Sequence, residues 1–286
     1  MYKTIDGKSI AGELRAKLKT KIAEYRSNSD KEIGLAVVLV GDDAASQVYV
    51  RNKINACEDV GIKSYAFYLP AQTAQNDVEE LICTLANDNN IHGILVQLPL
   101  PQHINTEKVL SLIPESKDVD GFSAANVGKL CLNERGLISC TPYGVMKMLE
   151  HENISVRGKN AVVIGRSNIV GKPMAMLLLN ADATVTVCHS KTTNLKEYCL
   201  NADILVSAIG KAKFVTSDMV KAGAVVIDVG INRDENNKLC GDVDFENVKD
   251  KCSYITPVPG GVGPMTITML LYNTYKTATG AEIDRF

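Results

Sequence analysis

The chain has 286 residues, a length typical of one large domain or, more commonly, of two. Of these residues 45% are hydrophobic and 22% are charged, which is the composition of an ordinary globular protein. Its net charge of −2 gives no electrostatic case for binding nucleic acid or an anionic membrane. No apolar run approaches the roughly 20 residues that a membrane span needs, and the N-terminus lacks the basic-then-apolar order of a signal peptide.

The first part of the chain alternates short apolar runs with helical patterns. This order implies right-handed crossovers and a parallel sheet. Asp42 or Asp43 can cap one of the helices, and Gly61 can end it. In chain order the expected elements are a helix over about 9–25, a strand at 33–41, a helix at 44–60, a strand at 63–70, a helix at 76–89 and a strand at 91–99.

One residue of the helix expected over 44–60 has an unexpected position. At about 100° per residue, the apolar residues of this helix other than Val48 share a sector roughly 160° wide, and Lys53 lies in the middle of it, one turn after Tyr49. A lysine can rest its stem on a core and keep its ammonium in water. The helical pattern alone therefore leaves a snorkelling lysine and a functional amine both open.

A stretch rich in Asp, Ser, Gly and Asn, residues 113–129, separates this part from the next. After it the sequence predicts a helix over 141–153, with Pro142 at its start, and a last helix from 265 to about 279 that returns to the first domain. Between these helices five short strands are expected, at 160–165, 183–190, 202–210, 223–232 and 253–261. We thus predict an α/β fold with two domains flanking a cleft, namely an N-terminal α/β substrate domain of 1–118 plus 265–286 and a Rossmann-like dinucleotide-binding domain of 119–264.

The eight cysteines predict neither a metal centre nor a disulfide framework. No two are spaced Cys-x-x-Cys, the four histidines stand far apart, and most cysteines lie in apolar runs, as Cys83 and Cys188 do. We therefore expect reduced core thiols, no metal, and a cytoplasmic location.

The segment AVVIGRSNIVGKP, residues 161–173, has the order strand, turn, helix. It is not a P-loop, because Pro173 stands where the magnesium-binding hydroxyl belongs. A dinucleotide loop fits better: Gly165 can supply the tight turn, Ser167 the small residue beside the pyrophosphate, and Gly171 the close helix–sheet packing. The segment departs from Gly-x-Gly-x-x-Gly, so a plain strand–helix corner is the alternative.

The tip of the next strand favours NADP over NAD. NAD enzymes usually carry Asp or Glu there to bind the ribose 2′-hydroxyl. This chain has His189, Ser190 and Lys191 instead, and no acid before Glu197. A 2′-phosphate would meet hydrogen-bond donors there, with Arg166 added from the first turn. A solvated loop is the alternative interpretation.

Five segments, taken together, carry a resemblance to a known family. In chain order they are YVRNKINACEDVGI, GILVQLPLP, KDVDGF, GRSNIVGKP and TPVPGGVGPMT. They resemble the bifunctional methylenetetrahydrofolate dehydrogenase/methenyltetrahydrofolate cyclohydrolase family. The resemblance implies a homodimer whose first domain binds folate and whose second binds NADP. It also implies oxidation of 5,10-methylenetetrahydrofolate to 5,10-methenyltetrahydrofolate with NADP, then hydrolysis to 10-formyltetrahydrofolate, in one-carbon metabolism.

The resemblance also assigns roles to single residues. It places the catalytic lysine on Lys53, its aromatic partner on Tyr49, the family's glutamine on Gln97 and the aspartate that anchors the pterin on Asp120. The other residues expected at the folate site are Leu98, Pro99, Pro259, Gly260 and Gly261, and those expected at the cofactor site are Gly165, Arg166, Ser167, Val170, Gly171, His189, Ser190 and Ile231.

The residues themselves support these roles but leave alternatives open. Gln97 closes a strand, where ligands of open α/β sheets gather, although polar strand ends are common. Asp120 can accept paired hydrogen bonds from a pterin or make an Asx-type turn, and Asp118 competes for either role. The loop 257–264 can frame a ligand or form a tight bend. A lysine amine serves as acid and base only if it can lose its proton near neutral pH, which partial burial and a cationic substrate favour.

Three rival functions fit parts of the sequence. The spacing from Tyr49 to Lys53 matches short-chain dehydrogenases, but in that family the pair follows the glycine loop, and here it precedes Gly165. Another two-domain NADP dehydrogenase, of the shikimate or amino-acid type, does not predict VQLPLP together with KDVDGF. A non-catalytic NADP sensor has no need of a lysine on a core face.

Overall fold

The computed structural model describes residues 2–29 and 31–281. The described chain divides into two compact units. The six-stranded unit comprises 2–12 and 141–266, and the three-stranded unit comprises 13–140 and 267–281. Two helices, α1 (Gly7–Ser29) and α10 (Val262–Thr279), contain residues of both units. None of the described helices is long and apolar enough to cross a membrane.

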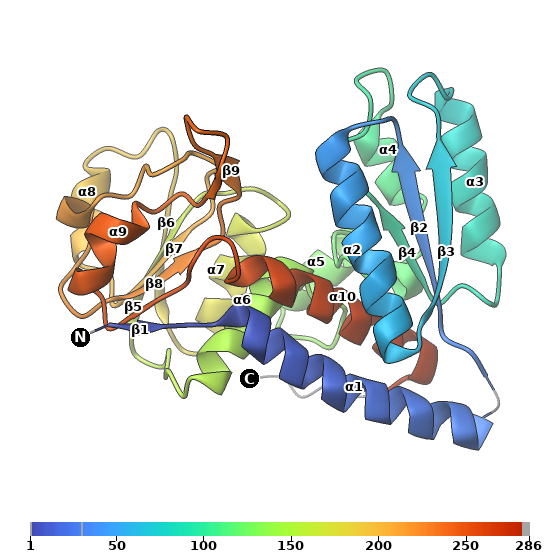
Figure 1. Cartoon of the computed structure of the whole chain (residues 1–286), viewed down its shortest axis with the longest axis horizontal. Helices are drawn as coiled ribbons and strands as arrows, with labels where there is room; N and C mark the ends of the chain where they lie inside the picture. Colours follow the sequence, from blue (N-terminus) through green and yellow to red (C-terminus); the bar gives the residue numbers. More distant parts are fainter. Residues whose placement is uncertain (1, 30, 282–286) are drawn as a thin grey trace. The chain divides into compact units, whose positions relative to one another are not determined.

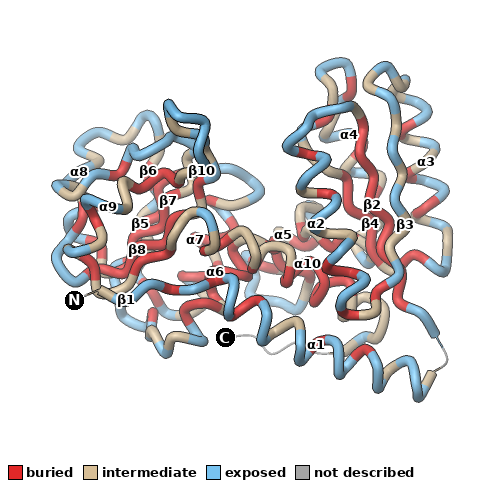
Figure 2. Tube along the Cα trace, viewed as in Figure 1, coloured by how far each residue is buried: buried red, intermediate tan, exposed pale blue. Residues whose placement is uncertain are grey.

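The six-stranded unit is built on a parallel sheet with the strand order β1-β11-β8-β7-β5-β6 (Figure 1). Its central strands are continuous aliphatic runs because helices cover both faces of such a sheet, and Figure 2 shows them as buried. The strands are β1 (Lys3–Thr4), β5 (Asn160–Ile164), β6 (Thr184–Cys188), β7 (Ile204–Ser207), β8 (Val225–Asp228) and β11 (Tyr254–Ile255). The remaining elements are α6 (Cys140–His151), α7 (Gly171–Asn180), α8 (Leu195–Leu200), α9 (Phe245–Val248), two 3₁₀ turns at Ser217–Met219 and Lys249–Lys251, and the hairpin β9 (Asn232–Arg233) and β10 (Leu239–Cys240).

The order of these strands locates the binding edge of the sheet. Strand β6 lies on one side of β5, and the next strand in the chain, β7, lies on the other side. Ligands of open α/β sheets bind at such a switch point, at the carboxyl ends of the strands. The residues that follow β5 and β7 therefore mark the edge where a ligand is expected.

The three-stranded unit has a parallel sheet of order β3-β2-β4, formed by β2 (Gly34–Val40), β3 (Lys63–Leu69) and β4 (Gly93–Val96). Alternate residues of β2 share a core cluster with α3 (Gln75–Asn87), and α2 (Ala44–Val60) connects β2 to β3. The crossovers put α2 and α3 beside the sheet, as Figure 1 shows. The other elements are most of α1, α4 (Thr106–Ser111), a 3₁₀ turn at Glu115–Lys117, α5 (Ala124–Cys131) and most of α10.

The predicted parallel α/β architecture and the return of the last helix to the first domain are confirmed. The compact units nevertheless differ from the predicted domains at three places, the smallest of which is that residues 265–266 belong to the six-stranded unit. Residues 2–12 belong to the six-stranded unit because β1 pairs with β11, and the units divide after Cys140, not after Asp118. The stretch 113–129, expected to be the junction, contains α5 and lies inside the three-stranded unit.

The cysteines carry free thiols, and five of the eight are buried. Cys188 is buried as predicted, whereas Cys83 is exposed and so is not a core residue. Cys83 lies on the outer side of α3, where the helix turns Val78, Ile82 and Leu85 inward.

Candidate active site

Helix α2 carries Lys53 and begins and ends where predicted. The side chain of Asp43 accepts a hydrogen bond of 2.7 Å from the Ser46 N–H, and this bond lowers the pKa of Asp43. Gly61, with φ of 89°, ends the helix in the left-handed region. Because α2 buries Val50 and its neighbours against the sheet, Lys53 on the same side is half-buried.

The amine of Lys53 is held by the glutamine that the sequence singled out. Its Nζ donates to Gln97 Oε1 at 3.0 Å, and Gln97 Nε2 donates to the Leu98 carbonyl at 2.7 Å, which fixes the orientation of the amide. The backbone N–H of Gln97 donates to Val38 O at 2.8 Å, so the sheet anchors Gln97 just beyond β4. The pair thus lies at the carboxyl ends of the strands, where a ligand is expected.

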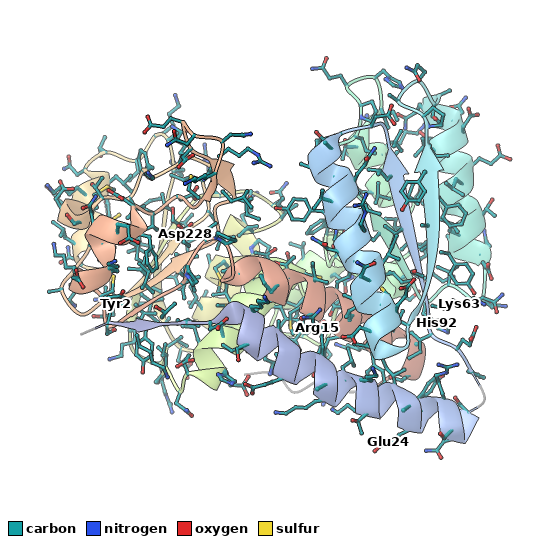
Figure 3. The ribbon with its side chains drawn as sticks, viewed as in Figure 1. Tyr2, Arg15, Glu24, Lys63, His92 and Asp228 are labelled. Carbon is teal, nitrogen blue, oxygen red and sulfur yellow. The ribbon has the colours of Figure 1, made fainter. Side chains whose placement is uncertain are left out.

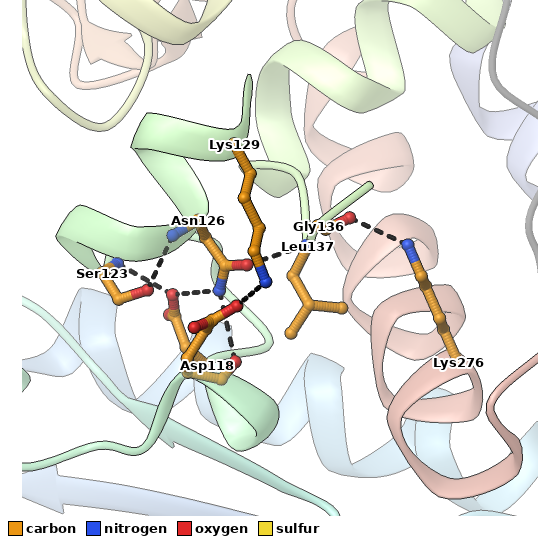
Figure 4. A network of polar contacts seen from close by, with 8 residues as sticks. Asp118, Ser123, Asn126, Lys129, Gly136, Leu137 and Lys276 are labelled. Carbon is orange, nitrogen blue, oxygen red and sulfur yellow. Dashed lines mark hydrogen bonds and ion pairs between the residues drawn. The ribbon is translucent and has the colours of Figure 1, made fainter. Parts of the chain in front are cut away.

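The two aspartates of KDVDGF have different roles, and Figure 4 shows the contacts of the first with Ser123 and Asn126. The carboxylate of Asp118 accepts from Phe122 N at 3.1 Å, Ser123 N at 2.8 Å and Asn126 Nδ2 at 2.9 Å. Asp118 therefore takes the structural turn role. Within the described residues, the carboxylate of Asp120 accepts no hydrogen bond, so its oxygens remain able to accept from a ligand.

Asp120, Lys53 and Cys140 form one electrostatic cluster. Burial raises the pKa of Asp120 to about 6, while the Lys53 ammonium opposes the rise and the Asp118 carboxylate adds to it. Burial also raises the pKa of the Cys140 thiol well above its usual value, with Asp120 adding to the rise. Asp120 is therefore mostly ionised at neutral pH and is protonated in mild acid, and Cys140 stays a thiol.

Helix α10 supplies a residue that the sequence analysis missed. Asn273, which is 1% exposed, donates from Nδ2 to Val119 O and to Ile138 O, both at 2.8 Å. A Cβ on Gly121 would lie 2.6 Å from Ile138 C, so the segment that holds Asp120 is packed against 138–140. The signal was an asparagine inside the apolar pattern MLLYNTY.

The other residues predicted near Lys53 also belong to the three-stranded unit. Tyr49 lies on α2 one turn before Lys53 and is half-buried. Leu98, half-buried, and Pro99, exposed, follow Gln97 directly.

The glycine loop has the geometry that a dinucleotide needs. Gly165 has φ of 122°, and a Cβ there would lie 2.3 Å from Ala208 O. A Cβ on Gly171 would lie 2.3 Å from Gly165 O, so α7 starts directly against the turn. Ser167 Oγ accepts from Val170 N at 3.1 Å and from Gly171 N at 3.2 Å, which leaves its hydroxyl proton for a phosphate. These contacts favour the dinucleotide loop over a plain corner.

The remaining residues predicted to contact the cofactor lie at the carboxyl ends of β5, β6 and β8, in the same unit. Arg166 and Ser190 are exposed, and His189 is half-buried, with its N–H donating to Thr192 Oγ1 at 2.9 Å. Ile231 follows β8 and is 49% exposed.

Pro259, Gly260 and Gly261 belong to the six-stranded unit, whereas Lys53 and the residues predicted near it belong to the three-stranded unit. Lys8 N donates to Gly260 O at 2.9 Å, and a Cβ on Gly7 would lie 1.9 Å from Gly261 O. This loop therefore seats the first turn of α1.

Two family models match the chain. Residues 5–120 match the catalytic domain of tetrahydrofolate dehydrogenase/cyclohydrolase, and residues 139–282 match its NAD(P)-binding domain. The chain belongs to the tetrahydrofolate dehydrogenase/cyclohydrolase family.

Relatives in this family match the chain over nearly its whole length. The bifunctional protein FolD of Campylobacter concisus is 60% identical over 276 residues, which are 96% of this chain and 97% of that protein. The crystal structure of the bifunctional FolD of Campylobacter jejuni has a TM-score of 0.96 at 53% identity and covers 98% of this chain and 99% of its own. The Trypanosoma brucei enzyme, complexed with NADP and an inhibitor, has a TM-score of 0.94 at 38% identity and covers 98% of each chain.

Proposed function

We propose that this chain oxidises 5,10-methylenetetrahydrofolate with NADP and hydrolyses the methenyl product to 10-formyltetrahydrofolate. Membership of the dehydrogenase/cyclohydrolase family supports both reactions. The observation that carries the proposal is the half-buried Lys53 amine, bonded at 3.0 Å to Gln97 Oε1 and within electrostatic range of Asp120.

The hydrolysis depends on proton transfers that Lys53 can perform. Water adds to the cationic methenyl carbon, and the adduct collapses by breaking the bond between that carbon and N5. The net reaction releases one proton. Lys53 takes the proton of the attacking water and returns a proton to the departing nitrogen. Gln97 holds the amine in place through its fixed carbonyl, and Tyr49 stacks on the substrate ring one turn away.

Asp120 anchors the substrate in this scheme. Its carboxylate accepts paired hydrogen bonds from the amino group and a ring N–H of the pterin, because Asp118 is already occupied by the turn. Leu98 and Pro99 are proposed to line the folate, and a role of 259–261 in folate binding stays a prediction from the family resemblance.

The glycine loop is proposed to bind NADP, which supplies the hydride acceptor when bound. Gly165, Ser167 and Gly171 admit the pyrophosphate, with Val170 at the start of α7 and Ile231 beyond β8. Arg166 and Ser190, with His189, offer donors to a 2′-phosphate, and the strand tip has no acid to repel it. A higher kcat/KM with NADP than with NAD tests this preference.

We also propose a homodimer in the cytoplasm that binds tetrahydrofolate derivatives and no nucleic acid. The family resemblance supports the dimer, the free thiols support a reducing compartment, and the net charge of −2 argues against nucleic acid. Sedimentation velocity and cell fractionation test the first two of these proposals.

Replacing Lys53 with Met tests the main proposal. Methionine keeps the apolar stem of the side chain and removes the amine, so we expect hydrolysis of methenyltetrahydrofolate to fall at least about 100-fold. The decay of the methenyl absorbance measures this rate without NADP.

Lys17→Met is the matched control, because Lys17 is exposed on α1 of the same unit. We expect its hydrolysis rate to stay within about twofold of the wild type. A folded Lys53→Met variant that hydrolyses at the wild-type rate would reject the proposed role.

A further inference from the structure

Two buried aspartates in the six-stranded unit have no role in the chemistry proposed above. Asp228 ends strand β8 (Figure 3) and is 3% exposed, and Asp242 follows β10 and is 0% exposed. Buried carboxylates are costly unless donors surround them. The groups that donate hydrogen bonds to these two carboxylates identify the loops that the aspartates connect.

Asp242 holds the turn that follows β7. Its Oδ2 accepts from Ile209 N at 2.8 Å, Gly210 N at 3.3 Å and Ser207 Oγ at 3.2 Å. Its Oδ1 accepts from Lys211 N at 2.8 Å. One carboxylate therefore binds three successive N–H groups and fixes the course of 209–211.

The same carboxylate also holds the loop after β8. Asp242 Oδ1 accepts from Asn232 Nδ2 at 2.9 Å. Asp228 Oδ1 accepts from Gly230 N and from Asp242 N, both at 2.9 Å, and its Oδ2 accepts from Val243 N at 2.8 Å. A Cβ on Gly230 would lie 2.2 Å from Asp242 Oδ1, so glycine is required for this approach.

Both loops bear on the proposed cofactor site. Ala208 begins the turn after β7, and its N–H donates to Ile164 O at 2.8 Å. A Cβ on Gly165 would lie only 2.3 Å from the Ala208 carbonyl oxygen, so this turn packs directly against Gly165. Ile231 lies between Gly230 and Asn232, which the aspartate pair holds on either side. The aspartate pair thus positions both the turn that packs against Gly165 and the residue Ile231.

We propose that Asp242, supported by Asp228, is a positioning residue for NADP: its carboxylate aligns the turn after β7 and the loop after β8 at the cofactor edge of the sheet. The inference rests on the proposed NADP site and adds residues that do not touch the cofactor. It predicts an effect on cofactor binding that is separate from stability and from hydrolysis.

The test compares Asp242→Asn with Asp203→Asn. An amide has only one acceptor oxygen. In Asp242→Asn an NH₂ group therefore faces either the N–H groups of Ile209 and Gly210 or the N–H group of Lys211, and those contacts are lost. Asp203 is a matched control, because its carboxylate also accepts a backbone N–H, from Asn160 at 2.9 Å, and pairs with Lys221, but at the opposite end of β7.

Calorimetric titration with NADP, thermal unfolding and hydrolysis without NADP are measured on each variant. We expect the Kd for NADP to rise at least about tenfold in Asp242→Asn and to stay unchanged in Asp203→Asn, with hydrolysis within about twofold of the wild type in both. If Asp242→Asn does not fold, Asn232→Ala keeps the carboxylate and removes one donor, and we expect a smaller rise in Kd.

Wild-type binding separates the two ideas. A wild-type chain that fails to bind NADP rejects the proposed cofactor site and the inference with it. A wild-type chain that binds NADP, together with an unchanged Kd in folded Asp242→Asn or in Asn232→Ala, rejects the positioning role alone.

Discussion

At the scale of single residues, the candidate site depends on Lys53 and Asp120, which interact electrostatically. The helical period placed Lys53 on the buried side of α2, and the structure has it half-buried and bonded to Gln97. Nothing in DVDG assigns the two roles, because both residues are aspartates within three residues of Gly121. Their roles separate only when Asn126, eight residues after Asp118, folds back to donate to it.

The raised pKa of Asp120 predicts a pH dependence for substrate binding. The pKa lies at about 6, above the usual value for aspartate, so the carboxylate gains a proton as the pH falls through 6. We expect the KM for methenyltetrahydrofolate to rise as the pH falls from about 7 to about 5, because a protonated Asp120 loses acceptor capacity. Hydrolysis assays without NADP measure this profile.

Two variants complete this experiment. Asp120→Asn should have a high KM that does not change with pH, while Asp77→Asn, on the exposed side of α3, should keep the wild-type profile. A wild-type KM that is flat over this range would contradict the assignment. The same titration also lowers stability as the pH rises between about 4 and 6, because the folded state holds this proton more tightly than the unfolded chain.

At the scale of elements, long periodic segments were predictable and short paired segments were not. Helix α2 has a full amphipathic pattern with a cap at each end, and its predicted bounds agree with the structure. Strand β1 and the hairpin of β9 and β10 have two residues per strand, which is too few for a period. Strand β1 forms because a partner distant in sequence, β11, offers it hydrogen bonds.

Helix α10 illustrates how one polar residue fixes an element. Asn273→Leu would remove the amide donor from the buried carbonyls of Val119 and Ile138, and Val119 O would keep the weak donor Cys140 Sγ at 3.2 Å. We expect the free energy of unfolding to fall by about 2–4 kcal/mol, measured by urea denaturation followed by circular dichroism. The control is Thr277→Ala, whose hydroxyl bonds, among the described residues, only to Thr274 O of the same helix, and its cost should stay below about 1 kcal/mol. Equal midpoints and slopes for Asn273→Leu and wild type would contradict this role of Asn273.

At the scale of the whole molecule, the division into units depends on contacts that the sequence does not show. Composition suggested a junction at 113–129, but Asp118 and Asn273 tie the residues up to Cys140 into the three-stranded unit. The two sets of residues proposed to bind folate and NADP fall on different sides of the observed division. Lys53, Gln97 and Asp120 lie in the three-stranded unit, whereas Gly165 and its loop lie in the six-stranded unit.

This separation predicts that one activity can be removed without the other. Gly165→Val places a branched side chain at φ of 122°, with its Cβ 2.3 Å from Ala208 O, so the turn must shift. We expect NADP binding and oxidation of methylenetetrahydrofolate to be lost, while hydrolysis of methenyltetrahydrofolate without NADP stays within about twofold of the wild type. Gly158→Val is the matched control: its φ of 69° is also positive, but no heavy atom of the described residues beyond its two chain neighbours lies within 4 Å of the added Cβ. It should have a similar backbone strain and bind NADP normally. If a folded Gly165→Val variant loses both activities in parallel, the two reactions do not divide between the units as the positions of Lys53 and Gly165 imply.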